Sequence, residues 1–122
     1  MKRAAENGEV VSQLSLGREY KNAKNYTEAM KWIQKAANAN FSPAMIELGD
    51  CYYNGIGINK NYSEAVRLYK KAAEQKNYYT YQAQKKVGDC YKYGRGVAQN
   101  QVLAEYWYEQ SKISEKNRFN LG

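Results

Sequence analysis

Apolar residues follow helical spacing in two neighbouring segments of the stretch 44–73. From Ala44 to Tyr52 they fall at i, i+4, i+7 and i+8, one stripe on a helix, and a second stripe begins at Ala65. The letters NGIG lie between the stripes and break the spacing with two glycines, which tolerate the positive φ angles of a tight reversal. The stretch therefore predicts two helices folded into a hairpin.

This hairpin unit recurs before and after the stretch. The earlier copy aligns at Ser12, an offset of 32 residues from Ala44, and the later copy aligns at Ala83, an offset of 39. One hairpin cannot bury its own apolar face, and periods in this range are typical of stacked helical repeats. We therefore predict an all-α fold, an α/α superhelical solenoid of three helix-turn-helix repeats.

The repeats divide the chain into segments of a single domain, 1–122. The chain starts inside one repeat unit and stops inside another, so we expect it to be a segment of a longer array. The segments that we predict are roughly 1–7 for the end of a preceding helix, 10–39, 42–75 and 81–113 for the hairpins, and 114–122 for a C-terminal tail or the start of a further repeat.

Two features of the units predict local structure. Asn25 and Asn61 precede the second helices of two copies and have a glutamate three residues on, the pattern of an N-cap. Each first helix has a mid-helix glycine, which costs about 0.5–1 kcal/mol relative to alanine but lets a partner helix approach closely. We expect the glycines to face alanines of the second helices, in the pairs Gly17 and Ala29, Gly49 and Ala65, and Gly88 and Ala104.

The sequences LGDCYYNGIGINKNYSEAVRLYKKAA and VGDCYKYGRGVAQNQVLAEYWYEQS resemble Sel-1-like repeats, a branch of the tetratricopeptide group. The second copy meets the family pattern almost fully, whereas the third departs from it at Ser111 and Lys112, where two alanines are expected. The first copy has the shorter turn of an ordinary tetratricopeptide repeat. The resemblance implies an α/α solenoid that binds proteins, usually as an adaptor, and it implies no chemistry.

The cysteines and the N-terminal segment bear on the compartment. Some exported members of the family carry paired cysteines that bridge the two helices of a repeat, whereas this chain has only Cys51 and Cys90, one in each of two copies. The start MKRAAENGEV lacks the apolar centre of about 7–15 residues of a secretory signal, and no apolar run reaches the roughly 20 residues of a membrane span. These features favour a cytoplasmic protein with buried, reduced cysteines.

The sequence does not predict an enzyme. The chain has no histidine, so neither cysteine nor any serine has the ordinary base of a catalytic triad, and two cysteines alone do not indicate a zinc site. The letters GIG and GRG suggest a phosphate-binding loop, but no strand precedes them and the third glycine of that motif is absent. We expect turns here, and a protein without catalytic residues, cofactor or metal.

The surface that remains for a partner is the face of each first helix that points away from its second helix. Two positions along a helix rotate by about 200°, so a stripe two residues beyond the core stripe faces outward. In tetratricopeptide-type arrays this face lines a concave groove, where arginine and lysine can hold acidic residues of an extended peptide. The predicted groove residues are Leu14, Arg18, Lys21, Asn22, Ile46, Asp50, Tyr53, Asn54, Lys85, Asp89, Lys92 and Tyr93.

The net charge of +7, from 19 Lys and Arg against 12 Asp and Glu, is compatible with several partners. Our main interpretation is a non-catalytic protein-interaction scaffold or adaptor that binds a protein or peptide, and the charge is compatible with an acidic one as well as with a role in solubility alone. One alternative is a basic helical-repeat module that binds nucleic acid, although the two tyrosines and two aspartates of the groove argue against it. The other is a purely structural segment of a longer solenoid.

The ends of the chain predict self-association. Solenoids normally finish with polar capping helices, and neither end shows one by sequence. Ala4 and Ala5 look like interior residues of a repeat exposed at the N-terminus, and the C-terminal tail repeats the Leu-Gly of a first helix. We therefore expect uncapped ends that join head to tail or exchange a terminal helix.

Overall fold

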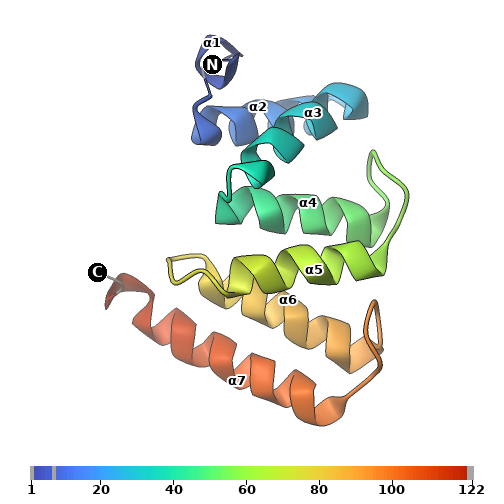
Figure 1. Ribbon diagram of the computed structural model, residues 1–122, viewed down its shortest axis with the longest axis vertical. Coiled ribbons are helices and arrows are strands. Elements are labelled where there is room, and N and C mark those ends of the chain that lie inside the picture. The colour runs from blue at the N-terminus through green and yellow to red at the C-terminus, as the bar shows by residue number, and fades with distance from the viewer. Residues whose placement is uncertain (1, 7, 121–122) are drawn as a thin grey trace.

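The computed structural model describes residues 2–6 and 8–120, and over these ranges it contains helices and no strand (Figure 1). In chain order the elements are α1 (Lys2–Glu6), α2 (Val10–Asn22), α3 (Tyr26–Asn38), α4 (Ser42–Asn54), α5 (Tyr62–Ala73), α6 (Thr80–Tyr93), α7 (Gln101–Asn117) and the 3₁₀ turn η1 (Arg118–Asn120).

The helices form hairpins that stack along the long axis of the molecule. The pairs α2 and α3, α4 and α5, and α6 and α7 pack against each other within hairpins, whereas α3 packs on α4 and α5 packs on α6 between them. Figure 1 shows the hairpins following one another in sequence order from the N-terminus, with α1 packed on α2. This arrangement confirms the predicted all-α solenoid.

Asparagine begins each of the second helices. The Oδ1 atoms of Asn25, Asn61 and Asn100 accept hydrogen bonds from the backbone N–H groups three residues on, at 3.5, 3.1 and 3.0 Å. Each bond satisfies a donor that would otherwise lack a partner at the start of the helix. The predicted N-caps are confirmed. The Glu64 carboxylate does not complete the reciprocal capping bond, because it accepts from Arg67 instead.

The mid-helix glycines lie at the closest contacts within the hairpins. A Cβ atom placed on Gly49 would lie 2.6 Å from Cε1 of Tyr69, and one on Gly88 would lie 2.7 Å from Cε1 of Tyr108. On Gly17 it would lie 2.6 Å from Cγ1 of Ile33. The expected close approach is confirmed, but the side chain that fills the space is the one four residues after the predicted alanine.

Each glycine loop joins the two helices of one hairpin and contacts the hairpin before it. Gly57 and Gly96 have φ angles of 73° and 76°, in the region that favours glycine. A Cβ on Gly57 would lie 2.9 Å from Cβ of Tyr26, and one on Gly96 would lie 2.4 Å from the carbonyl oxygen of Tyr62. Each loop therefore packs on the start of the preceding hairpin's second helix, as the turns expected from the sequence.

The ends of the stack carry charged residues at positions that interior hairpins bury. Glu19 is exposed at the position that aligns with buried Cys51, and Glu105 is exposed at the position of buried Val66. The end faces are therefore polar at these two positions, and the aligned sequence already carries both differences. Self-association through the ends stays a prediction. Residues 1, 7, 121 and 122, which belong to the predicted end segments, lie outside the described ranges.

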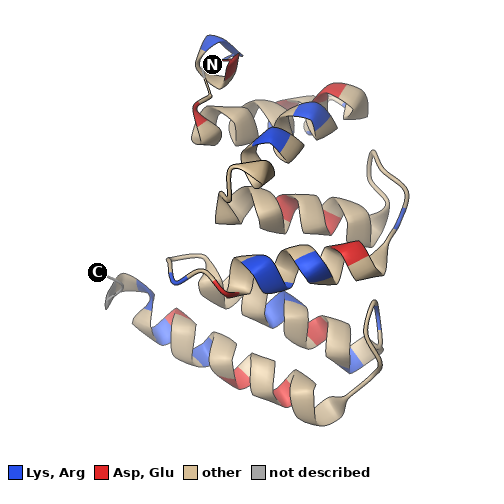
Figure 2. Cartoon of the chain, in the orientation of Figure 1, with Lys and Arg blue, Asp and Glu red and all other residues tan. Residues whose placement is uncertain are grey.

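Cys51 and Cys90 are buried, as predicted, each at the same position of its hairpin. Within residues 2–6 and 8–120, no helix combines the length and apolar character that a membrane crossing needs. The same ranges contain no group of three potential metal-ligating side chains. Figure 2 shows that acidic and basic residues are spread along the stack and do not gather at one end.

Candidate functional site

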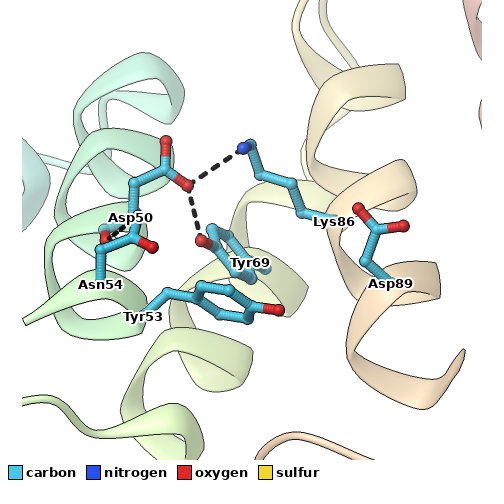
Figure 3. A pocket seen from close by; sticks show the side chains of 6 residues that line it. All are labelled: Asp50, Tyr53, Asn54, Tyr69, Lys86 and Asp89. Atoms are coloured by element: carbon cyan, nitrogen blue, oxygen red, sulfur yellow. Dashed lines mark hydrogen bonds and ion pairs between the residues drawn. The ribbon is translucent and has the colours of Figure 1, made fainter. Parts of the chain in front are cut away.

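A hollow of about 220 Å³ lies where the first helices of the second and third hairpins face each other. Its lining comes from three helices, and the side chains point toward one another in Figure 3. Four of the lining residues were predicted for the groove and two were not. The lining residues are Asp50, Tyr53 and Asn54 of α4, Tyr69 of α5, and Lys86 and Asp89 of α6.

Tyr69 reaches the hollow from the second helix of its hairpin. Its ring crosses α4 where Gly49 has no side chain, and its hydroxyl donates a hydrogen bond of 2.6 Å to Oδ1 of Asp50. Burial, and then the bond to Asp50, raise the pKa of Tyr69 above its ordinary value, so the phenol remains a neutral donor. The glycine thus places a buried hydroxyl at the bottom of an open face.

The third hairpin repeats this pair, and the first does not. Tyr108 crosses α6 at Gly88 and donates to Oδ1 of Asp89, and burial raises the pKa of this phenol as well. In the first hairpin the aspartate position is Arg18 and the tyrosine position is Ile33. The fixed carboxylate therefore belongs to the second and third hairpins, which are the two that form the hollow.

Lys86 joins these two hairpins across the hollow. Its Nζ lies 3.0 Å from Oδ1 of Asp50, and both interactions of that carboxylate are drawn in Figure 3. The side chain of Asn54 donates to the carbonyl oxygen of Asp50 at 3.1 Å, which orients the amide at the edge of the hollow. The result is a fixed set of hydrogen-bonding groups with two carboxylates and one ammonium group.

A different ion pair joins the first and second hairpins. Nε of Arg18 lies 2.9 Å from Oε1 of Glu47, and Lys21 binds the other carboxylate oxygen. Burial acts to raise the pKa of Glu47, but the hydrogen bonds from Lys21 and Arg18 outweigh it and hold the pKa below its ordinary value. Two of the four cations predicted to hold acidic residues of a partner are therefore engaged within the chain.

Arg95, between the glycines of the third loop, lies among three aromatic rings. Its guanidinium carbon is 5.5, 5.7 and 5.2 Å from the ring centroids of Tyr53, Tyr62 and Tyr93. Nη1 also donates to the hydroxyl of Tyr53 at 2.7 Å. These cation–π contacts hold the loop against the second hairpin and fix two of the predicted groove tyrosines.

The structure does not expose all predicted groove residues. Leu14 and Ile46 belong to the buried core, at 4% and 6% exposure, so their assignment to the groove is wrong. A helix inside a stack has neighbours on two sides, and the rule of one core stripe counts only the partner in its own hairpin. Asp50, Tyr53, Asp89 and Lys21 are partly buried, whereas Arg18, Asn22, Asn54, Lys85, Lys92 and Tyr93 are exposed.

Sequence reasoning missed Tyr69, Lys86 and Arg95. A signal for Tyr69 was present, because a tyrosine follows the Gly-Asp pair at the same distance in the second and third copies. Lys86 is one residue beyond predicted Lys85, a difference of about 100° around the helix that a stripe argument does not resolve. Arg95 was visible only as the middle letter of GRG.

The comparison with family models agrees with this geometry. The Sel1 repeat model matches residues 11–41, 42–77 and 82–112. The chain belongs to the Sel1 repeat family. Two curated relatives, the proteins named DAP3-binding cell death enhancer 1 of Rattus norvegicus and Mus musculus, are each 34% identical over 79 residues. These matches cover 63% of the chain and 16% of the relatives' length.

Solved structures give the same Sel1 repeat fold. One is c5321, a protective antigen of uropathogenic Escherichia coli strains with an SLR fold, at a TM-score of 0.86 and 36% identity over 92% of this chain and 24% of that one. Another is a Sel1 repeat protein of Oxalobacter formigenes, at a TM-score of 0.85 and 33% identity over 92% of this chain and 86% of that one.

Proposed function

We propose that this Sel1 repeat chain is a non-catalytic scaffold that binds a protein or peptide on the face formed by α2, α4 and α6. The observation that carries the proposal is the hollow between α4 and α6, where polar side chains from three helices converge in fixed positions. Preorganised donors and acceptors lower the entropic cost of ordering a flexible ligand. An extended peptide brings backbone N–H and C=O groups that such a surface can pair.

The ion pairs narrow the chemistry of the partner. Arg18 and Lys21 are engaged by Glu47, so the cations left on this face for acidic residues are Lys85 and Lys92, both exposed on α6. The hollow itself holds two carboxylates beside one ammonium group. We therefore propose a partner of mixed charge, with an acidic residue near the exposed lysines of α6 and a polar segment in the hollow.

The relatives support a protein as the partner class. Members of the Sel1 repeat family are generally modules of protein–protein interaction. The rat and mouse relatives are named for binding DAP3, and they share a part of their length with this chain. These names do not identify the partner of this chain, because most of each relative's length lies outside the match.

The test begins with peptides selected on the immobilised chain from a random display library, whose binding is then measured by fluorescence anisotropy. Asn54→Ala and Lys86→Ala remove groups that line the hollow. Asn22→Ala is the matched control in the first hairpin, and Lys71→Ala is the control for an exposed lysine of α5 outside the lining and off this face. We expect at least about a tenfold loss of affinity for the lining variants and less than about a twofold loss for Asn22→Ala.

Two results would contradict the proposal. Selected peptides that bind all four variants equally would place their site elsewhere on the chain. Failure to select any peptide, together with binding of single-stranded RNA that weakens steeply with salt, would support a nucleic-acid module instead. Thermal unfolding followed by circular dichroism checks that each variant is folded at the temperature of the binding measurement.

A further inference from the structure

On the outer side of the stack, the last helix, α7, carries apolar residues where the equivalent helices α3 and α5 carry polar ones. Four positions that are polar in both α3 and α5 are apolar in α7. Because α3 and α5 occupy the same place in their hairpins and are polar at these positions, the repeat fold does not require apolar residues there. The apolar residues and their equivalents in α3 and α5 are Val102 (Thr27, Ser63), Leu103 (Glu28, Glu64), Tyr106 (Lys31, Arg67) and Ile113 (Asn38, Glu74).

These side chains form an exposed stripe, which we call the outer stripe. Val102 is 75% exposed, Tyr106 52%, Ile113 45% and Leu103 36%. Gln110 continues the stripe, in place of lysine in the other hairpins, so its members recur at helical spacing along one side of α7. A contiguous apolar surface of this kind marks an interaction site more often than scattered apolar residues do.

The outer stripe is separate from the side on which a further hairpin would stack. On that side α7 carries Glu105 and Lys112, at the positions where α5 buries Val66 and Ala73. Joining chains head to tail would bury these two charged groups, which costs free energy unless each finds a partner. The structure therefore directs association away from the end of the stack and toward its outer side.

A second hollow lies beside the C-terminal part of the outer stripe. Its volume is about 450 Å³, and it extends between the end of α5, the start of α6 and the second half of α7. Ile113 and Gln110 of the stripe line it on one side, and Ala73 and Thr80 line it on the other. The hollow has room for an apolar side chain from a surface docked on the stripe.

The charges beside the stripe indicate the direction of an approaching helix. Glu105 and Glu109 lie in the N-terminal and central turns of α7, and Lys112 and Lys116 lie in the C-terminal half, where the remaining acidic residue, Glu115, is paired with Arg118 (Figure 2). A second α7 placed antiparallel brings each acidic half beside a basic half, whereas a parallel one brings like charges together. The helix is thus complementary in charge to itself in one orientation.

We propose that the outer stripe is the interface of a two-fold symmetric dimer, in which the α7 helices of two copies pack antiparallel. In this register Leu103 lies opposite Ile113 of the second copy, at the hollow beside that residue. Glu105 lies opposite Lys112 of the second copy. The same surface serves both copies, as two-fold symmetry requires. A dimer presents two peptide-binding faces in one particle, so multivalent partners bind with higher avidity.

Sedimentation equilibrium over a range of concentrations tests the dimer. A single pair of helices buries less than a standard interface, so we expect a dissociation constant on the order of 10 μM. The double variant Tyr106→Arg with Ile113→Glu introduces the residues that α5 carries at these positions, and we expect a monomer. The control Lys31→Ala with Lys35→Ala removes two exposed lysines of α3, away from the outer stripe and its flanking charges, and we expect the dimer to persist.

Charge reversal tests the orientation. We expect Glu105→Lys alone and Lys112→Glu alone each to weaken the dimer several-fold, and the two changes together to restore most of the affinity. A native chain that is monomeric up to millimolar concentration would overturn the proposal and leave the stripe to another protein or to a segment of a longer chain. A dimer that survives the Tyr106→Arg and Ile113→Glu changes, in protein with native circular dichroism, would also overturn it.

Discussion

The first and second hairpins share a backbone plan and differ in the chemistry around their mid-helix glycines. In the first hairpin, Gly17 faces the aliphatic side chain of Ile33. The residue after the glycine, Arg18, points out of the hairpin and binds Glu47 of the next one. At this glycine the hairpin is closed by apolar contact, and the charged residue beside it binds the neighbouring hairpin.

The second hairpin places a polar group where the first has an apolar one. Gly49 faces the ring of Tyr69, whose hydroxyl binds the next residue, Asp50. That carboxylate also binds Lys86 of the third hairpin. The glycine sets how closely the helices approach. The residue after it and the residue opposite it differ between the two hairpins, and they decide whether the outer face carries an ion pair to the next hairpin or a hollow with fixed polar groups.

The largest effect should come from filling the space at the glycine of the second hairpin. Gly49→Leu should lower the free energy of unfolding by about 3 kcal/mol, because its side chain would overlap the ring of Tyr69. Urea denaturation measures the change. Glu19→Leu adds the same side chain at an exposed position of α2 and should have little effect. An unchanged midpoint for Gly49→Leu would mean that the two helices do not touch there.

The cysteines give the next largest effect and a direct contrast with the first hairpin. Burial raises the pKa of Cys51 and of Cys90 from 9.0 to about 11, which lowers the reactive thiolate fraction roughly 100-fold near neutral pH. Both thiols should react slowly with a thiol reagent in the native protein and rapidly in denaturant. In Glu19→Cys the added thiol takes the exposed equivalent position and should react first. Equal rates for all three would contradict the burial of this position in the interior hairpins.

Removing the phenol hydroxyl of the second hairpin should have a moderate effect. Tyr69→Phe leaves the ring in place but deprives Asp50 of a donor, at a cost of about 1–2 kcal/mol in the free energy of unfolding. Tyr108→Phe removes the matching bond in the third hairpin and should cost less, because Tyr108 is the more exposed of the two. Equal losses in urea denaturation would show that burial does not set the strength of this pair.

The ion pair of the first hairpin should have the smallest effect and a characteristic dependence on pH. The pKa of Glu47 is lowered in the folded protein, so its stabilising contribution is full above the unfolded pKa of about 4.5 and is lost as the pH falls through the folded value. Glu47→Gln should lower the free energy of unfolding by about 1 kcal/mol or less near pH 7. The variant should then lose less stability than the native chain on acidification to about pH 3.

Melting curves at several pH values test this prediction. Glu64→Gln is the matched control, since the pKa of Glu64 is lowered chiefly by its hydrogen bond with Arg67 of the same helix. Its effect on acid stability should be smaller, because that pair is more exposed and does not join two hairpins. If both variants respond alike to acid, the cross-hairpin pair has no special contribution.

The amino-acid sequence by itself determined the hairpins and the fact that they stack. Recurring glycines and alanines marked the close contacts, and asparagines marked the starts of second helices. The NGIG and GRG letters marked the turns, since a positive φ angle is a local requirement that one residue type meets. These signals depend on neighbours within a few positions of the chain, so they can be seen without the fold.

Only the tertiary structure decided which side chains remain available on the outer face. Helical periodicity reports one buried direction, but each interior helix packs against its own partner and the next hairpin, which buries Leu14 and Ile46. The pairing of Arg18 with Glu47, and the choice of Lys86 over Lys85, depend on how two stacked helices lie against each other. That geometry follows from packing between residues far apart in the chain, and no local pattern encodes it.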